Sequence, residues 1–145
     1  MTIQPTRIAA VMGGPQVLGL RVRSILDLSA AVERGLPKSA LKTTVERVFG
    51  DSQNRRRMIY RIVPEATYKR RRDRLTLVES ERTERLARVI ATAEYVWDDP
   101  QKAHRFLTTP HPQLAGKSPL EASATELGAR LVEELSARIF YGLPA

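Results

Sequence analysis

Almost all of the net positive charge of this chain lies in one short stretch, residues 55–74. The stretch holds nine of the 24 Lys and Arg residues but only two of the 16 Asp and Glu residues, so it carries seven of the chain's eight net positive charges. The rest of the chain is close to neutral. Because basic side chains that neutralise phosphates release bound counterions, such a cluster favours a polyanionic partner. A solvated basic face without a partner is the alternative.

The pattern around this stretch predicts two short helices with a break between them, at residues 51–62 and 64–74. Met58, Ile59 and Ile62 form an apolar side of the first helix, and the arginines among them face water. Proline disfavours the α conformation at the preceding residue and is favourable in the first turn of a helix, so Val63-Pro64 marks the break. A helix, a tight break and a short basic helix are the outline of a helix-turn-helix, whose second helix enters the major groove of DNA.

Composition favours an all-α fold. The chain is 42% hydrophobic and 28% charged but only 6% aromatic, so its core is mainly aliphatic, and few runs alternate as strands do. It has no cysteine, which excludes disulfides and thiolate chemistry. No apolar run approaches the roughly 18 residues that span a bilayer, and the N-terminus lacks the features of a signal peptide. We therefore expect a cytoplasmic location and no membrane partner.

Apolar periodicity and turn residues predict the remaining organisation. Residues 1–15 are interrupted by Pro5 and Pro15 and by Gly13-Gly14, and we expect a flexible tail. Helices are predicted at residues 22–34 and 38–49, which with the two basic helices make one bundle over residues 16–75. A second helical domain is predicted over residues 76–145.

The second domain opens with the longest predicted helix, residues 76–97. Thr76 and Glu79 have the spacing of a capping box, and an apolar stripe runs from Leu86 to Trp97. A short helix follows Asp99-Pro100, another starts at Ser118-Pro119 with Glu121 at the third position, and a final helix covers residues 125–140. In the final helix the apolar residues Leu127, Leu131, Leu135 and Ile139 are spaced by four.

No catalytic or metal-binding group is predicted. His104 and His111 are the only side chains that ordinarily titrate near neutral pH, and neither has metal ligands or a nucleophile beside it in the sequence. Glu79, Glu81 and Glu84 are interpreted as solvated helix charges. We therefore expect a binding protein that is not an enzyme and needs no cofactor.

Several stretches of the second half resemble the Xre/MbcA/ParS-like antitoxins of bacterial toxin–antitoxin pairs. They are Thr67-Tyr68-Lys69-Arg70-Arg71, residues 79–88, the run from Phe106-Leu107 through Pro110-His111-Pro112 to Ser118-Pro119, and Thr125-Glu126-x-Gly128 with the end of the last helix. Tyr68, Phe106 and His111 depart from the family's usual Leu, Trp and Asn. The first half is similar only in the order of its helices and in Gly35-Leu36-Pro37.

The resemblance implies a Cro/C1-like helix-turn-helix domain over residues 16–75 and a toxin-binding domain over residues 76–145. It also implies an antitoxin that covers the active site of a RES-domain toxin, an enzyme that consumes NAD. Such proteins bind their own operator DNA as homodimers and repress it. The alternative left open is a basic protein that binds nucleic acid without sequence preference and has a helical partner-binding domain.

The basic stretch and the resemblance together predict the residues of two interfaces. The DNA-binding residues are Arg55, Arg56, Arg57, Thr67, Tyr68, Lys69, Arg70, Arg71, Arg72 and Arg74. The toxin-binding residues are the apolar C-terminal segment, Phe140, Tyr141, Gly142, Leu143, Pro144 and Ala145. This segment either enters a concave site on the toxin or covers the core of its own domain, and the sequence does not decide between the two.

Overall fold

The computed structural model describes residues 1–145 and consists of helices joined by short loops. Its α-helices are α1 (Pro5–Val11), α2 (Gly14–Leu18), α3 (Ile25–Arg34), α4 (Lys38–Glu46), α5 (Ser52–Ile62), α6 (Glu65–Arg70), α7 (Leu77–Trp97), α8 (Pro100–Thr108), α9 (Pro119–Ala122) and α10 (Glu126–Phe140), and a 3-10 turn covers Pro112–Leu114. An isolated bridge between Pro37 and Arg74 is the sole β-type pairing. The predicted all-α class is confirmed.

The chain forms two compact units, and the division falls inside α7. One unit comprises Gln4–Ala87, and the other comprises Met1–Ile3 with Arg88–Ala145. The predicted boundary between the functional domains, between residues 75 and 76, lies just before α7 and twelve residues before this division.

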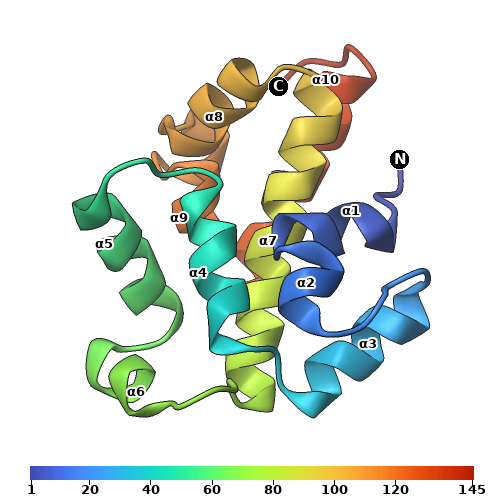
Figure 1. Ribbon diagram of the computed structural model, residues 1–145. Coiled ribbons are helices and arrows are strands. Elements are labelled where there is room, and N and C mark those ends of the chain that lie inside the picture. Colours follow the sequence, from blue (N-terminus) through green and yellow to red (C-terminus); the bar gives the residue numbers. More distant parts are fainter. The chain divides into compact units, whose positions relative to one another are not determined.

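The first unit contains α1 to α6 and the first half of α7. Figure 1 shows α5 and α6 on one side of α4, and α1, α2 and α3 on its other side. Its core is aliphatic, and the largest fully buried side chains include Met12, Leu36, Leu41, Val63 and Leu86. Removing such aliphatic groups from water is the main stabilising contribution to a unit of this size.

The prediction of a flexible tail at residues 1–15 is wrong. Residues of that segment form α1 and the start of α2, and Ile8, Val11 and Met12 are buried. Pro5 lies in the first turn of α1, where a missing N–H leaves no hydrogen bond unmade. Gly13 has a φ of +109°, so it makes the turn between two helices. The prolines and glycines thus mark helix boundaries in an ordered segment.

The second basic helix is shorter than predicted, because α6 ends at Arg70. Its last four predicted residues lie outside the helix, and Arg74 pairs with Pro37, which directly precedes α4. The Lys38 amide donates to the Asp73 carbonyl at 2.8 Å, and the Leu75 amide donates to the Leu36 carbonyl at 2.9 Å. These hydrogen bonds compete with continuation of the helix, and no local sequence signal marks them.

The second unit contains the rest of α7 and the helices α8 to α10. Its helix starts are those that the sequence predicts: Asp99 caps α8, Ser118 and Glu121 form a complete capping box on α9, and Thr125 caps α10. Ile90 and Leu107 are fully buried members of its core.

The inner face of α10 differs from the row of leucines seen in the sequence. Leu127 is 70% exposed and Leu131 is 50% exposed, whereas Ala129, Val132, Leu135 and Ser136 are buried. A step of four residues advances about 40° beyond one full turn of an α-helix, so residues spaced strictly by four rotate away from a single face. The buried residues stay on one side, because Val132 lies three residues from Ala129 and from Leu135 and four from Ser136.

Candidate nucleic-acid interface and toxin-binding segment

The first basic helix, α5, is fixed by a capped start and a buried apolar side. The Asp51 carboxylate accepts a hydrogen bond from the Asn54 amide at 3.0 Å, and this bond lowers the pKa of Asp51. Met58, Ile59 and Ile62 are buried. Arg56 and Arg57 consequently face water.

Arg55 differs from the two arginines that follow it. Its Nε donates to the Phe49 carbonyl at 2.7 Å, and the side chain is only partly exposed. The guanidinium of Arg55 therefore holds the loop before α5, while Arg56 and Arg57 are exposed over the same helix.

The second basic helix, α6, has six residues and buries none of them. Ala66, Lys69 and Arg70 are exposed at the spacing of three and four that defines one helix face. Lys69 also pairs with Glu65 of its own helix at 2.7 Å, and this hydrogen bond raises the pKa of Lys69. The outer face of α6 thus presents the short methyl of Ala66 between two cationic side chains.

Tyr68 and Thr67, both predicted to bind DNA, are half-buried. The Tyr68 ring meets the Tyr60 ring edge-on at a centroid distance of 6.1 Å, and the Lys38 Nζ lies 4.2 Å above the Tyr68 ring. Burial raises the pKa of the Tyr68 hydroxyl. Tyr68 therefore packs α6 against α4 and α5.

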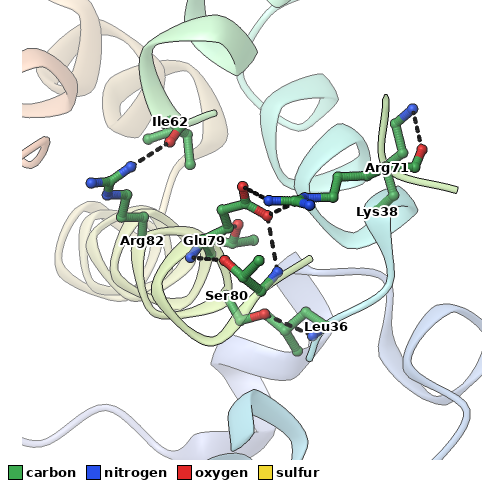
Figure 2. A network of polar contacts seen from close by, with 9 residues as sticks. Leu36, Lys38, Ile62, Arg71, Glu79, Ser80 and Arg82 are labelled. Atoms are coloured by element: carbon green, nitrogen blue, oxygen red, sulfur yellow. Dashed lines mark hydrogen bonds and ion pairs between the residues drawn. The ribbon is translucent and has the colours of Figure 1, made fainter. Parts of the chain in front are cut away.

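Arg71 forms a two-pronged ion pair with Glu79 at the start of α7. Its Nε donates to Oε1 and its Nη2 donates to Oε2, each at 3.1 Å (Figure 2). Glu79 is 6% exposed, so the prediction that it is a solvated charge is wrong. Burial raises the pKa of Glu79, but hydrogen bonds from Arg71 and from the Thr76 amide outweigh burial, and the pKa lies below its usual value. The same ion pair raises the pKa of Arg71.

The last two predicted arginines, Arg72 and Arg74, are both exposed, and Arg74 also donates from Nη1 to the Gly35 carbonyl at 2.6 Å. A side chain at Gly35 is excluded there, because its φ is +88° and a Cβ would lie 2.5 Å from the Leu75 carbonyl oxygen. The DNA-binding roles of all ten residues stay predictions. The structure places Arg56, Arg57, Lys69, Arg70, Arg72 and Arg74 on the surface. It uses Arg55, Arg71 and the exposed Arg74 in contacts within the unit.

The predicted toxin-binding segment follows α10 and is exposed. The Leu143 amide donates to the Arg138 carbonyl at 2.8 Å and the Gly142 amide to the Ile139 carbonyl at 3.1 Å, which is the Schellman pattern, with Gly142 at a φ of +68°. Phe140 is 42%, Tyr141 58% and Leu143 57% exposed. The turn thus directs the apolar segment away from the helix axis with most of its side-chain surface in water.

Three further exposed apolar side chains in this unit were missing from the sequence prediction. Tyr95 stacks on Phe140 at a centroid distance of 5.5 Å and is itself 38% exposed. Leu127 and Leu131 project from the outer side of α10. The sequence gives one sign that these leucines face outward, which is the spacing of the other apolar residues of α10. They are separated by three or four residues and so lie on a different side of the helix from Leu127 and Leu131.

Both histidines lie in the second unit. His104 is exposed on α8, and the His111 Nδ1 accepts a hydrogen bond from the Gln113 amide at the start of the 3-10 turn. No group of three or more potential ligand residues that could hold a metal ion occurs in the chain. None of its helices is both long enough and apolar enough to cross a membrane.

Comparison with known proteins gives matches to both halves. Residues 27–88 match the antitoxin Xre-like helix-turn-helix domain, and residues 92–142 match the antitoxin Xre/MbcA/ParS C-terminal toxin-binding domain. A curated protein of Pseudomonas putida named Antitoxin Xre is 37% identical over 84 residues, which are 56% of this chain and 53% of that protein. The match thus spans about half the length of this relative. With a helix-turn-helix domain followed by a toxin-binding domain, the chain belongs to the Xre family of antitoxins.

Proposed function

We propose that this protein neutralises a cognate RES-domain toxin, an NAD-consuming enzyme, and represses its own operon in the cytoplasm. Repression proceeds through binding of a homodimer to operator DNA. The observation that carries the proposal is the union, in one chain, of a helix-turn-helix domain with an exposed basic helix and a toxin-binding domain with an exposed apolar end.

The DNA-binding part of the proposal is supported by the placement of charge. The exposed cations lie on two successive short helices and the residues after them, and α6 presents Lys69 and Arg70 on its outer face. A short helix with an exposed basic face fits the major groove, where phosphates flank the base edges. Phosphate contacts by such residues make the affinity depend steeply on salt.

The toxin-binding part is supported by the exposure of the C-terminal segment. If residues 140–145 covered the core of their own unit, Phe140, Tyr141 and Leu143 would be buried, and all three are exposed. An exposed apolar segment at the end of a helix is a feature of surfaces that bind other proteins. The structure therefore favours insertion into a concave site on the toxin over coverage of the protein's own core.

An enzyme assay tests the toxin-binding proposal. The proposed cognate RES-domain toxin is purified, and its consumption of NAD is followed with increasing amounts of this protein. We expect inhibition that is complete near a fixed stoichiometric ratio, because a covered active site cannot bind NAD. A RES enzyme that keeps full activity at a large excess of this protein contradicts the proposal.

A second candidate function, binding of nucleic acid without sequence preference, is favoured by the local concentration of charge alone. The two candidates differ in one measurement. A repressor binds a duplex from the region upstream of its own gene more tightly than a random duplex of equal length, whereas a non-specific binder has equal affinity for both.

A further inference from the structure

The helix α6 has no fully buried face. It has only six residues, every one of them is at least partly exposed, and Tyr68 is its main packing contact with α4 and α5. A helix this short is not stable by itself in water, since nucleation is unfavourable and few hydrogen bonds follow. Contacts at the two ends of α6 therefore act with Tyr68 to fix where its outer face points.

At the N-terminal end, α6 is joined to α5 by a buried residue and a capped carbonyl. Val63 is fully buried, and Arg82 of α7 donates from Nη1 to the Ile62 carbonyl at 3.3 Å. This carbonyl is the last of α5 and has no partner within the helix. The end of α5 is therefore held by α7 (Figure 2).

At the C-terminal end, Arg71 connects α6 to two other helices. Its guanidinium pairs with Glu79 of α7, and its carbonyl accepts a hydrogen bond from the Lys38 Nζ of α4 at 3.2 Å (Figure 2). An arginine–carboxylate pair with two parallel hydrogen bonds fixes orientation as well as distance. Arg71 thus sets the direction in which the chain leaves α6.

Glu79 is itself held rigidly. Its Oε1 also accepts from the Thr76 amide at 2.9 Å, as the carboxylate of a capping box does. The next residue, Ser80, is fully buried and its Oγ accepts from the Leu36 amide at 2.8 Å. The carboxylate therefore projects from a helix start that is anchored in the core of the unit.

We propose that Glu79 is a positioning residue for DNA recognition, and that Arg71 is its partner rather than a phosphate ligand. By holding the Arg71 guanidinium, Glu79 fixes α6 in the orientation that exposes Lys69 and Arg70, and it keeps Arg71 away from DNA phosphates. The inference rests on the proposed function, in which α6 binds the operator.

Salt dependence separates these roles, because each lost phosphate contact reduces the slope of log affinity against log salt by about one. The probes are a duplex from the region upstream of this gene and a random duplex of the same length, both titrated with full-length protein over a range of salt. The variants are Arg70→Ala, Arg71→Ala and Glu79→Gln. Glutamine retains capping ability at Glu79 but cannot form the ion pair. Glu81→Gln, an exposed position on the same helix, is the matched charge control.

We expect Arg70→Ala to reduce the slope by about one on both duplexes, as the loss of one phosphate contact requires. Arg71→Ala should leave the slope unchanged and reduce the preference for the upstream duplex about tenfold, comparable to the loss of one base contact. Glu79→Gln should reduce the preference similarly but increase the slope by about one, because the freed Arg71 then reaches phosphate. Glu81→Gln should change neither the slope nor the preference.

The double variant Arg71→Ala, Glu79→Gln removes both charges of the ion pair and leaves no unpaired charge in the buried site. It therefore replaces a single variant that does not fold. We expect it to show the slope and the reduced preference of Arg71→Ala. If Arg70→Ala has no effect on either duplex, the proposed role of α6 fails. Two results overturn the positioning role and leave the proposed function standing, provided that Arg70→Ala acts as expected. One is that Arg71→Ala reduces the slope and leaves the preference for the upstream duplex intact. The other is that Glu79→Gln behaves as Glu81→Gln does.

Discussion

At the scale of single residues, the buried carboxylate of Glu79 links stability to pH. Its pKa is lowered in the folded protein, because the hydrogen bonds from Arg71 and Thr76 favour the ionised form more than burial disfavours it. A group whose pKa is lower in the folded protein than in the unfolded chain stabilises the fold at pH values above its unfolded pKa. This stabilisation is lost as the pH falls through the folded pKa.

We therefore expect the free energy of unfolding to fall on acidification below the ordinary glutamate pKa of 4.5, in part because of Glu79. Glu79→Gln should be less stable than wild type at neutral pH, and the difference should shrink as the pH is lowered through that window. Urea unfolding of both proteins at a series of pH values measures this, with Glu81→Gln as the control. A constant difference between wild type and Glu79→Gln down to pH 3 contradicts the assignment.

Gly128 is a second residue whose identity is fixed by its surroundings. It lies in α10, where alanine is ordinarily the better helix former by about 1 kcal/mol. A Cβ at this position, however, would overlap the Ala122 carbonyl oxygen. This close approach gives a physical reason for the glycine in the stretch Thr125-Glu126-x-Gly128.

Gly128→Ala should accordingly lower the free energy of unfolding by about 1 to 3 kcal/mol, the usual cost of overpacking. Thermal or urea unfolding monitored by circular dichroism measures the change. Gly50→Ala is the matched control, because nothing lies within 4 Å of a Cβ there and its φ is not positive. Equal stability of the two variants argues against the tight contact between α10 and Ala122.

At the scale of elements, local signals predicted helices well and long-range contacts poorly. The helix α5, the long helix α7 and the caps at Asp99 and Ser118 follow from apolar spacing and cap residues close in sequence. The end of α6 could not be predicted, because it depends on pairing with Leu36 and Lys38, more than thirty residues earlier.

Long-range contacts also limited the prediction of the candidate interfaces. The sequence identified the basic stretch as a unit, but the hydrogen bonds that Arg55, Arg71 and Arg74 make within the unit depend on acceptors in other elements. For Glu79, the capping-box spacing was visible in the sequence, whereas its ion pair with Arg71 required knowledge of where the chain returns after α6.

The orientation of α10 can be tested by paired truncations. Leu135 is 2% exposed and Leu131 is 50% exposed, although they are one turn apart. Leu135→Ala should destabilise the protein by about 2 to 5 kcal/mol through the lost burial and the resulting cavity. Leu131→Ala should change stability by no more than about 0.5 kcal/mol. Similar losses in the two variants, measured by urea unfolding, contradict the orientation of the helix.

The C-terminal segment can be removed without disturbing a core. Deletion of residues 141–145 removes exposed residues beyond the end of α10, so the folded unit should remain stable. We expect inhibition of the RES toxin to be lost, because the apolar segment that we propose to enter its active site is missing. The NAD-consumption assay measures this outcome. A shortened protein that inhibits at the wild-type ratio rejects insertion of the segment.

At the scale of the whole molecule, the basic stretch and the exposed apolar C-terminal segment lie far apart in the sequence. Seven of the eight net positive charges lie in residues 55–74, within the helix-turn-helix match. The exposed apolar residues Phe140, Tyr141 and Leu143 lie at the other end, at or just beyond the end of the toxin-binding match. We therefore propose that one unit binds nucleic acid and the other binds the toxin.

The most direct test of this assignment is one variant in two assays. Arg70→Ala, Arg72→Ala removes two exposed cations from residues in and after α6. Its affinity for the upstream duplex is measured over a range of salt, and its inhibition of NAD consumption by the RES toxin is titrated in parallel. The account predicts weaker DNA binding, with the salt slope reduced by about two, and inhibition of the toxin at the wild-type ratio. Unchanged DNA binding, or loss of inhibition in a folded variant, contradicts it.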